Sequence, residues 1–395
     1  MLPEAPTGAT SIFTLMTATS EPRWLTRWFG VLASPIEGQV IVGPNWFASV
    51  MGTGIVAVAG VTLPASVPRL LTTTAWGVAV VLLIALVVFM PLNWRRYPDN
   101  FRTLANDPIA IQFFGAPPMA FMTVASGTLL VGQAYLGETL AVSVGWVLWA
   151  VGTVLGLLTA VIVPYRLFTR LEVRHDGAFG GWLMPVVPPM VSAAVGALLV
   201  AHTPAGELRE TMLLFCYACF GMSLVTSLII ITLIWSRLAH FGSSGSARVP
   251  TLWIVLGPVG QSITAAGALG TAALIAVPPP LSTAFDAFAV VFGVPMFGFM
   301  LLWMPMAAAL TIRAHRRNMG FALTWWSFTF PVGTCVTGAS QLAKHTDLTV
   351  FAVFAVALYV GLLLAWVTVA LRTFRASHAV LTPPAVSPQP AAQKG

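Results

Sequence analysis

The stretch Trp325-Trp326-Ser327-Phe328-Thr329-Phe330-Pro331 is the starting point for interpreting the whole chain. It lies in an uncharged run, Asn318 to Ala343, that is long enough to cross a bilayer as a helix. Pro331 predicts a bend in this helix, because proline lacks a backbone N–H and its ring presses on the preceding turn. In a membrane a broken helix is tolerated where the freed backbone groups meet protein or line a cavity. We therefore expect a bent helix beside a cavity, with Phe330 just before the bend.

Similar helix breakers recur along the chain at a regular interval. Pro118, Pro188, Pro258 and Pro331 are separated by 70, 70 and 73 residues. Gly52, in the sequence Met-Gly-Thr-Gly, lies 66 residues before Pro118 and is the other kind of helix weakener. Five breakers at one period predict five copies of one structural unit.

The composition is that of an integral membrane protein. Of the 395 residues, 57% are hydrophobic and only 8% are charged, whereas a soluble domain carries about 25% charged residues. The apolar runs are continuous over roughly 20 residues, which indicates helices and not barrel strands. The net charge of +7 comes from cations scattered in short loops. Without a basic stripe beside aromatic residues, this pattern excludes nucleic-acid binding.

Ten charge-free runs predict ten transmembrane helices in an all-α protein. Their approximate ranges are 41–63, 71–93, 108–132, 140–165, 180–202, 211–236, 250–276, 286–312, 319–342 and 348–371. We expect residues 1–40 to form a cytoplasmic N-terminal tail or interfacial segment, 41–372 the transporter domain, and 373–395 a disordered cytoplasmic tail. Within the first segment, Arg23 and Arg27 each precede a tryptophan and would share one face of an interfacial helix.

The distribution of cations predicts how the chain is oriented. Sixteen Lys and Arg residues fall on the side of the membrane that holds both termini, and only Arg69, Arg209 and Lys344 fall on the other. By the positive-inside rule both termini are cytoplasmic, and the number of spans is even.

The breakers and the spans together predict a ring. Every breaker falls on an odd-numbered span, so the repeated unit is a helical hairpin and successive hairpins are parallel copies. Five such hairpins can close into a pseudo-fivefold ring, with kinked inner helices around a central pore. The eighth span departs from the pattern, because Pro295 and Pro305 predict kinks in an even-numbered helix.

Charged residues are missing from the predicted spans, and this excludes several function classes. The six histidines fall at span ends, in loops or in the tail, so we expect neither an intramembrane proton relay nor an acidic cation filter. No nucleophile with a base stands out, which argues against an enzyme. Cys216 and Cys219 form a C-x-x-C inside a span, without a second pair or a nearby His. We expect these two and Cys335 to be buried packing residues, with no metal or cofactor.

Uncharged polar groups remain at pore depth. Hydroxyls, amides and loosened peptide N–H groups stabilise an anion weakly, so it can leave quickly, as conduction requires. Any single Ser or Thr could equally serve interhelical packing. The argument rests on the set, which comprises Thr53, Gln112, Ser126, Gln261, Ser262, Thr264, Thr329, Thr334 and Ser340.

Phe330 is the candidate pore gate. A Phe in a membrane helix usually faces lipid or core, but this one precedes the predicted bend in a ring of breakers. An apolar side chain across a narrow pore gates by excluding water. The predicted pore-lining or kink residues around it are Gly52, Thr53, Gly54, Pro117, Pro118, Pro188, Pro189, Gly257, Pro258, Phe328 and Pro331.

Two segments make the chain resemble a known family over roughly residues 40–372. Asn45-Trp46-Phe47-Ala48-Ser49-Val50-Met51-Gly52-Thr53-Gly54-Ile55-Val56 and Trp325 to Pro331 are similar to the tellurite-resistance/dicarboxylate transporter family. That family includes the plant guard-cell slow anion channels and the fungal malate and sulfite transporters. The resemblance implies ten helices in five hairpins, a trimer with one pore per subunit, and a pore-plugging Phe at Phe330. Gly52 and Gly54 stand where the family pattern suggests a proline, and the long regulatory tails of the plant channels are absent.

These observations together predict a plasma-membrane anion channel or transporter. The expected substrates are small anions: monovalent inorganic anions, sulfite or C4-dicarboxylates. A proton-coupled C4-dicarboxylate carrier or a sulfite exporter is the main alternative. A membrane sensor or scaffold that transports nothing is a third possibility.

Overall fold

The computed structural model describes residues 34–36, 39–41, 43–243 and 245–381. Almost all of this part of the chain is helical, as predicted. The strands among the described residues form one short antiparallel pair, β1 (Ser34–Ile36) and β2 (Gln39–Ile41). The interfacial helix predicted around Arg23 and Arg27 lies outside the described residues.

Eight helices in the described part of the chain are long and apolar enough to cross a membrane. They are Pro44–Thr62, Arg69–Arg96, Ala110–Leu136, Glu138–Thr169, Glu207–Phe241, Ser246–Ala276, Leu281–His315 and Thr349–Ala376. Shorter helices occupy the other two predicted spans: α8 (Pro188–Val200) has 13 residues and α12 (Phe330–Thr346) has 17. The count of ten spans therefore stays a prediction.

The helices form a buried set and a peripheral set. The buried helices are α2 (Phe47–Thr62), α5 (Ala116–Gly127), α8, α10 (Leu256–Ala276) and α12, and most of their residues are buried. Each packs against the long helix that follows it: α3 (Arg69–Arg96), α7 (Glu138–Thr169), α9 (Glu207–Phe241), α11 (Leu281–His315) and α13 (Thr349–Leu381). Only 22–33% of the best apolar window of each long helix is buried. Their exposed apolar faces are suited to lipid.

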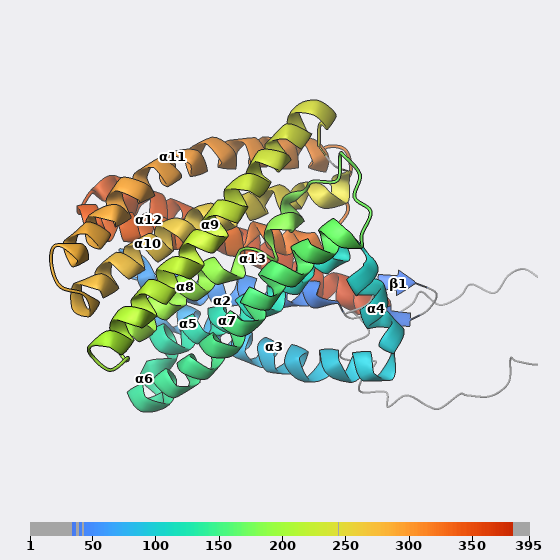
Figure 1. The fold of residues 1–395 in the computed structure, drawn as a ribbon. Coiled ribbons are helices and arrows are strands. Elements are labelled where there is room, and N and C mark those ends of the chain that lie inside the picture. The colour runs from blue at the N-terminus through green and yellow to red at the C-terminus, as the bar shows by residue number, and fades with distance from the viewer. Residues whose placement is uncertain (1–33, 37–38, 42, 244, 382–395) are drawn as a thin grey trace, which may run out of the picture.

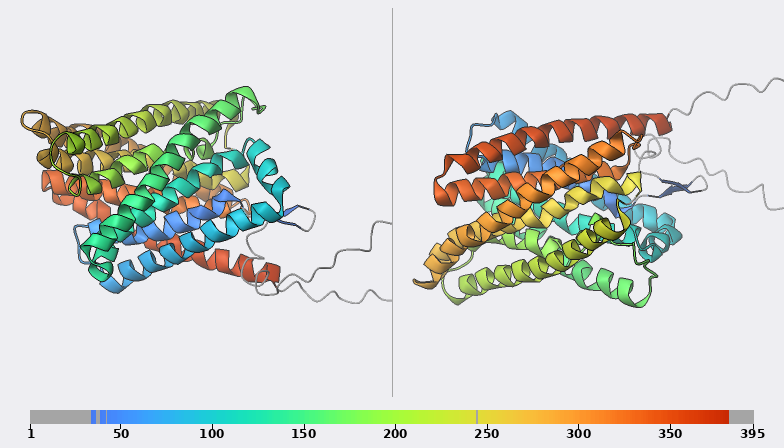
Figure 2. Two further views of the ribbon diagram at one scale, coloured as in Figure 1. Left: turned by 60° about the horizontal axis from the view of Figure 1, so that its bottom comes forward. Right: turned by 90° about the horizontal axis from the view of Figure 1, so that it is seen from above.

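Contacts run between neighbouring buried helices from the first to the last. Helix α2 contacts α5, α5 contacts α8, α8 contacts α10, α10 contacts α12, and α12 contacts α2. The helices run lengthwise between two ends of the molecule (Figures 1 and 2). We call one the α4 end, after α4 (Pro98–Asn106), and the other the α6 end, after α6 (Gln133–Leu136) (Figure 1).

The repeated prolines lie where the α-helical parts of these segments start. Pro118, Pro188, Pro258 and Pro331 all lie within the first three residues of α5, α8, α10 and α12. A 3₁₀ segment precedes each of these helices: η2 (Ala110–Gly115), η4 (Gly180–Leu183), η5 (Ser246–Val255) and η6 (Leu323–Phe328). Proline fits the first turn because the N–H it lacks would have no partner there. The predicted mid-span kinks are thus changes from 3₁₀ to α geometry.

Gly52 and Gly54 do not interrupt their helix, because α2 continues through both. A Cβ at Gly52 would lie 2.2 Å from Thr329 Oγ1, and one at Gly54 would lie 2.8 Å from Thr123 Cγ2. The glycines therefore let α2 approach the start of α12 and the middle of α5 closely. Their role is close packing, in contrast to the expected helix break.

Two further expectations differ from the structure. Helix α11 begins at Leu281 and continues through Pro295 and Pro305. Asp286, the first residue of the predicted span 286–312, therefore lies in the second turn of a membrane-length helix. Helix α13 extends to Leu381, beyond the start of the predicted disordered tail, and 382–395 lie outside the described residues.

Candidate functional site

A large cavity of about 660 Å³ lies where the buried helices begin, toward the α4 end. The 3₁₀ segments and first helical turns position its walls, so residues distant in sequence meet there. Its lining includes Asn45, Trp46, Met51, Asp107, Phe113, Met119, Met184, Val187, Ile254, Gly257, Pro258, Trp326, Ser327, Phe330, Pro331 and Thr373. The lining is mostly apolar, with a few polar groups.

A second cavity of about 60 Å³ lies further along the same helices, toward the α6 end. All five buried helices contribute to it, joined by Leu130 of η3 (Thr128–Gly132). Its lining comprises Ile55, Val58, Thr62, Thr123, Ser126, Leu130, Val191, Ala194, Val195, Leu198, Gln261, Thr264, Ala268, Phe330, Thr337 and Gln341. Among these side chains none is charged.

Phe330 is the residue that the two linings share. It is the first residue of α12 and is only 5% exposed. The turn before it is held by Thr329, whose hydroxyl donates to the carbonyl oxygen of Trp326 over 2.7 Å. The Phe330 side chain thus stands between the two cavities on a locally fixed backbone.

The polar groups of the smaller cavity are neutral, and most bond within the protein. Thr123 donates to Met119 O over 2.8 Å, and the hydroxyls of Thr264 and Thr337 lie 2.6 Å apart. Gln261 and Ser126 are 5% and 7% exposed. Neither side chain has a hydrogen-bond partner among the described residues. Their amide and hydroxyl donors are available to a ligand that accepts hydrogen bonds.

One carboxylate lines the larger cavity, and backbone donors partly offset its charge. Asp107 Oδ1 accepts from the backbone N–H groups of Ile109 and Ala110 over 2.8 and 2.6 Å. On the α13 side of this cavity, the Arg372 guanidinium stacks on the Trp325 ring, 4.7 Å from its centroid. This cation lies next to Thr373, which lines the cavity.

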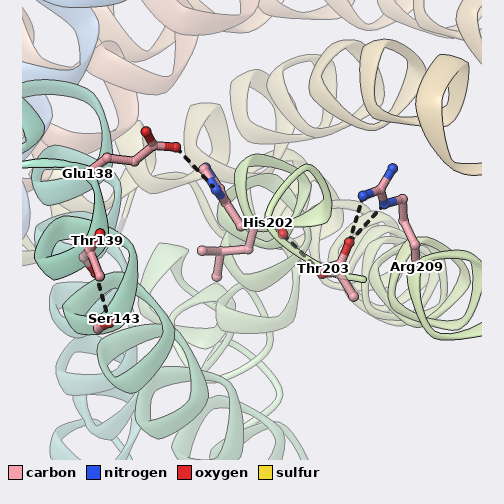
Figure 3. A network of polar contacts seen from close by, with 7 residues as sticks. Glu138, Thr139, Ser143, His202, Thr203 and Arg209 are labelled. Atoms are coloured by element: carbon pink, nitrogen blue, oxygen red, sulfur yellow. Dashed lines mark hydrogen bonds and ion pairs between the residues drawn. The ribbon is translucent and has the colours of Figure 1, made fainter. Parts of the chain in front are cut away.

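The α6 end carries a separate polar network (Figure 3). His202 Nδ1 lies 3.9 Å from Glu138 Oε1 at the start of α7. Arg209 of α9 donates through Nε and Nη2 to Thr203 O over 2.9 and 2.8 Å. It thereby satisfies a carbonyl just beyond α8, which a helix C-terminus would otherwise leave without a donor. These side chains join α7, α8 and α9, and none of them lines either cavity.

In the α7–α8 connection, outside the predicted spans, an ion pair stabilises the loop. Arg174 Nε donates to Asp176 Oδ1 over 3.0 Å, and this hydrogen bond lowers the pKa of the Asp176 carboxyl. Arg237, near the end of α9, donates to the backbone oxygen of Asp176 over 3.0 Å. The loop is thus tied to the end of α9 on the α4 side.

The structure brings four of the predicted gate, pore-lining or kink residues to the wall of the larger cavity, namely Gly257, Pro258, Phe330 and Pro331. It also brings three of the predicted polar residues, Ser126, Gln261 and Thr264, to the wall of the smaller cavity. Thr53 instead accepts a hydrogen bond from Trp366 Nε1 over 3.1 Å. The other residues predicted to line the pore or kink its helices also lie outside both linings, namely Gly52, Gly54, Pro117, Pro118, Pro188, Pro189 and Phe328. The same holds for the predicted polar residues Gln112, Ser262, Thr329, Thr334 and Ser340.

Phe328 packs edge-on against aromatic neighbours, with ring centroids 5.6 Å from Trp253 and 5.7 Å from Trp325.

The prediction that the cysteines are buried is confirmed, since Cys216, Cys219 and Cys335 are at most 2% exposed. Cys216 packs against Gly196, whose added Cβ would lie 2.4 Å from its Sγ.

Sequence reasoning missed most of the apolar lining. Met119, Met184, Val187 and Ile254 line the larger cavity, yet none carries a chemical signal. Their only sequence signal is position, because each lies within four residues of one of the repeated prolines. Since those prolines mark where helices start around one cavity, their neighbours are brought to its wall.

The membrane-length helices, the buried helices behind them and the two cavities between these helices define a multi-pass membrane transport protein. The comparison with family models makes this specific. The chain belongs to the voltage-dependent anion channel family, whose model matches residues 42–374. The resemblance noted in the sequence is thereby confirmed, because this family includes the slow anion channels.

Curated relatives match the same part of the chain. A sulfite efflux pump of Trichophyton rubrum is 27% identical over 339 residues, covering 82% of this chain and 88% of that protein. An uncharacterized transporter of Methanocaldococcus jannaschii is 28% identical, covering 84% and 92%. A malic acid transport protein of Schizosaccharomyces pombe is 21% identical, covering 82% and 75%. The family and these relatives are channels and transporters, not enzymes.

Proposed function

We propose that this protein moves small anions across the membrane through the centre of each subunit. The route runs from the larger cavity, past Phe330, into the smaller cavity and out at the α6 end. The observation that carries the proposal is that Phe330 lines both cavities. A phenylalanine between two water-accessible spaces acts as a gate, because an apolar constriction excludes water and ions until it moves.

In this proposal the five buried helices form a ring around the route and the five long helices surround them. The pairwise contacts from α2 to α12 and back to α2 support the ring. All five buried helices contribute to the lining of the smaller cavity, which supports a pore along its axis. Counting α8 and α12 as spans gives the ten-helix, five-hairpin arrangement, with both termini on the cytoplasmic side.

The charge distribution supports an anion as the substrate. The smaller cavity is lined by side chains without formal charge, and Gln261 and Ser126 offer donors there. Helices α5, α8, α10 and α12 begin at or near the larger cavity, and their dipoles place partial positive charge at their starts. A small anion is therefore stabilised by helix dipoles and neutral donors, without a fixed cation. It is bound weakly enough to leave the route again.

The names of the relatives support the substrate class. The fungal relatives are a sulfite efflux pump and a malic acid transport protein, so sulfite and C4-dicarboxylates stand beside monovalent inorganic anions as candidate substrates. A coupled carrier is the second candidate function, favoured by the word pump in the name of the Trichophyton rubrum relative. The family resemblance supports a homotrimer in the plasma membrane.

The test is anion flux in proteoliposomes of the purified protein. Chloride, sulfite and malate are compared at equal concentration, each with and without a pH gradient. Flux without a gradient supports the channel. Flux that requires the gradient, after correction for the titration of the anion itself, supports the carrier. No flux of any of the three anions would overturn the proposed function.

A further inference from the structure

A buried histidine lies just beyond the smaller cavity, toward the α6 end. His345 is in the last turn of α12, and its side chain is only 7% exposed. It contacts three helices of the bundle. Nε2 lies 3.4 Å from Asp286 Oδ1 of α11 and 3.4 Å from Thr271 Oγ1 of α10. Nδ1 lies 2.8 Å from the backbone oxygen of Gln341 in α12 itself.

These partners assign different roles to the two ring nitrogens. A carbonyl oxygen can only accept, so Nδ1 carries a hydrogen and donates it to Gln341 O whatever the charge of the ring. Nε2 is therefore the atom that gains and loses a proton. In the neutral ring Nε2 can accept from the Thr271 hydroxyl, and in the charged ring it donates to the Asp286 carboxylate. Each protonation state thus has a partner already in place.

The histidine is connected to the proposed anion route through one residue. Gln341, one helical turn before His345, lines the smaller cavity. Its Oε1 is buried without a hydrogen-bond partner among the described residues. A Cβ at Gly267 of α10 would lie 2.8 Å from Gln341 Cβ, so α10 holds this side chain closely. A change of charge or position at His345 therefore acts directly beside the cavity wall.

Few other charges surround His345. Asp286 of α11 lies at this end, and next to it Phe285 stacks on Tyr217 of α9 at 4.4 Å. On α12 itself Lys344 is exposed, and Asp347 follows the helix and is exposed. Arg209 reaches the end of α10 at Ile275 O. Helices α10 and α2, which also pack on α12, contain no charged residue, and the nearest titratable group of α13, Tyr359, bonds to Val56.

We propose that His345 is a proton-binding site linked to anion passage. A proton from the solution at the α6 end binds Nε2 and is released to the same solution. With the ring neutral, Asp286 leaves a net negative charge beside the route. With the ring protonated the pair is neutral, and an anion is repelled less. The inference rests on the proposed anion route, and it adds a dependence of transport on pH.

The first test measures chloride flux in proteoliposomes, because the charge of chloride does not change with pH. The pH is set equal on both sides and varied from about 8 to about 5, the range in which a histidine changes charge. We expect wild-type flux to rise on the order of tenfold as the pH falls, as one unit charge acting over about 10 Å would produce. His345→Gln should remove this rise. Asp286→Asn should raise flux at the alkaline end.

The matched control is His202→Gln. His202 is also a histidine at the α6 end with a carboxylate nearby (Figure 3). It is more exposed than His345, and no residue of its polar network lines either cavity. The control should keep the wild-type pH profile. The inference is overturned if wild-type flux is independent of pH, or if His345→Gln and His202→Gln give the same profile.

A second test does not depend on flux. In protein with ¹⁵N-labelled histidine, the NMR titration midpoint of His345 is measured with and without chloride. Because linkage is reciprocal, an anion that binds better next to the protonated ring must raise that midpoint. A midpoint that chloride leaves unchanged overturns the inference. A raised midpoint without wild-type flux would retain the linked proton site and overturn the proposed transport function.

Discussion

The Tyr359 hydroxyl of α13 donates to the backbone oxygen of Val56 in α2 over 3.2 Å, although 303 residues separate them in the chain. This hydrogen bond joins the last helix of the bundle to the first. Trp366, two turns further along α13, makes a second link to α2 through Thr53. The ends of the described bundle are thus held together by hydrogen bonds within the predicted membrane region.

Removing the Tyr359 hydroxyl tests this closure. Tyr359→Phe should lower the free energy of unfolding by about 1 kcal/mol, because the interhelical hydrogen bond from Tyr359 to the α2 backbone is lost. The measurement is the thermal unfolding midpoint in mild detergent. Tyr165→Phe is the control, since Tyr165 is 60% exposed on α7. Equal midpoints for the two variants would show that the hydrogen bond contributes nothing to stability.

Phe330→Ala tests the gate. Opening the constriction between the two cavities should raise anion flux several-fold at equal protein content. Phe328→Ala is the matched control, because Phe328 is two residues away in the same aromatic stretch but lines neither cavity. Flux in Phe330→Ala at or below the wild-type level, with normal expression and folding, would rule out occlusion by this side chain.

Gly52→Ala tests the close approach of α2 to the start of α12. The new Cβ would lie 2.2 Å from Thr329 Oγ1 and 2.6 Å from Trp326 Cε3, so the rigid indole must shift. Overpacking of this kind costs about 1–3 kcal/mol. Gly77→Ala in α3 meets nothing within 4 Å and should instead stabilise the helix by about 0.5–1 kcal/mol. Opposite shifts of the two unfolding midpoints are expected, and a stabilised Gly52→Ala would contradict the packing.

Pro258→Ala and Pro188→Ala test whether a proline affects transport by lining the larger cavity or by starting a helix. Both prolines lie in a first helical turn, but only Pro258 lines the larger cavity. We expect Pro258→Ala to change anion conductance, measured in planar bilayers, and Pro188→Ala to leave it close to wild type. Identical conductance in wild type and both variants would mean that these turns do not shape the route.

Native mass measurement in mild detergent tests the predicted trimer. Three subunits per particle are expected from the family resemblance. A monomer that still transports would remove the trimer and leave the route within each subunit unaffected.

The sequence predicted the membrane-spanning helical class well, because long uncharged apolar runs have few other stable conformations. It also predicted the periodic positions Pro118, Pro188, Pro258 and Pro331, but not that a 3₁₀ segment would precede each of them. A proline in the sequence is compatible both with a bend inside a helix and with the start of a helix. Only the path of the preceding residues, such as η6 before Pro331, distinguishes the two outcomes.

The candidate site was less predictable. Phe330 stood out through its position before Pro331, whereas Met184 and Val187 reach the cavity wall because the chain before them packs η4 against η5 and η2. Asp286 was placed at a span boundary, but α11 starts at Leu281 and so includes it. Its pairing with His345 depends on the packing of α11 against α12, which no local pattern reveals.

The prolines in the first helical turns have a consequence for selectivity. Free N–H groups at a helix start can donate hydrogen bonds to an anion. Pro118, Pro188, Pro258 and Pro331 each remove one such donor. The helix dipoles still attract an anion, but fewer donors replace its hydration shell. On the proposed route, the ease with which each anion sheds water would then rank the permeating species. Loosely hydrated nitrate should cross faster than chloride, and tightly hydrated divalent anions should cross most slowly.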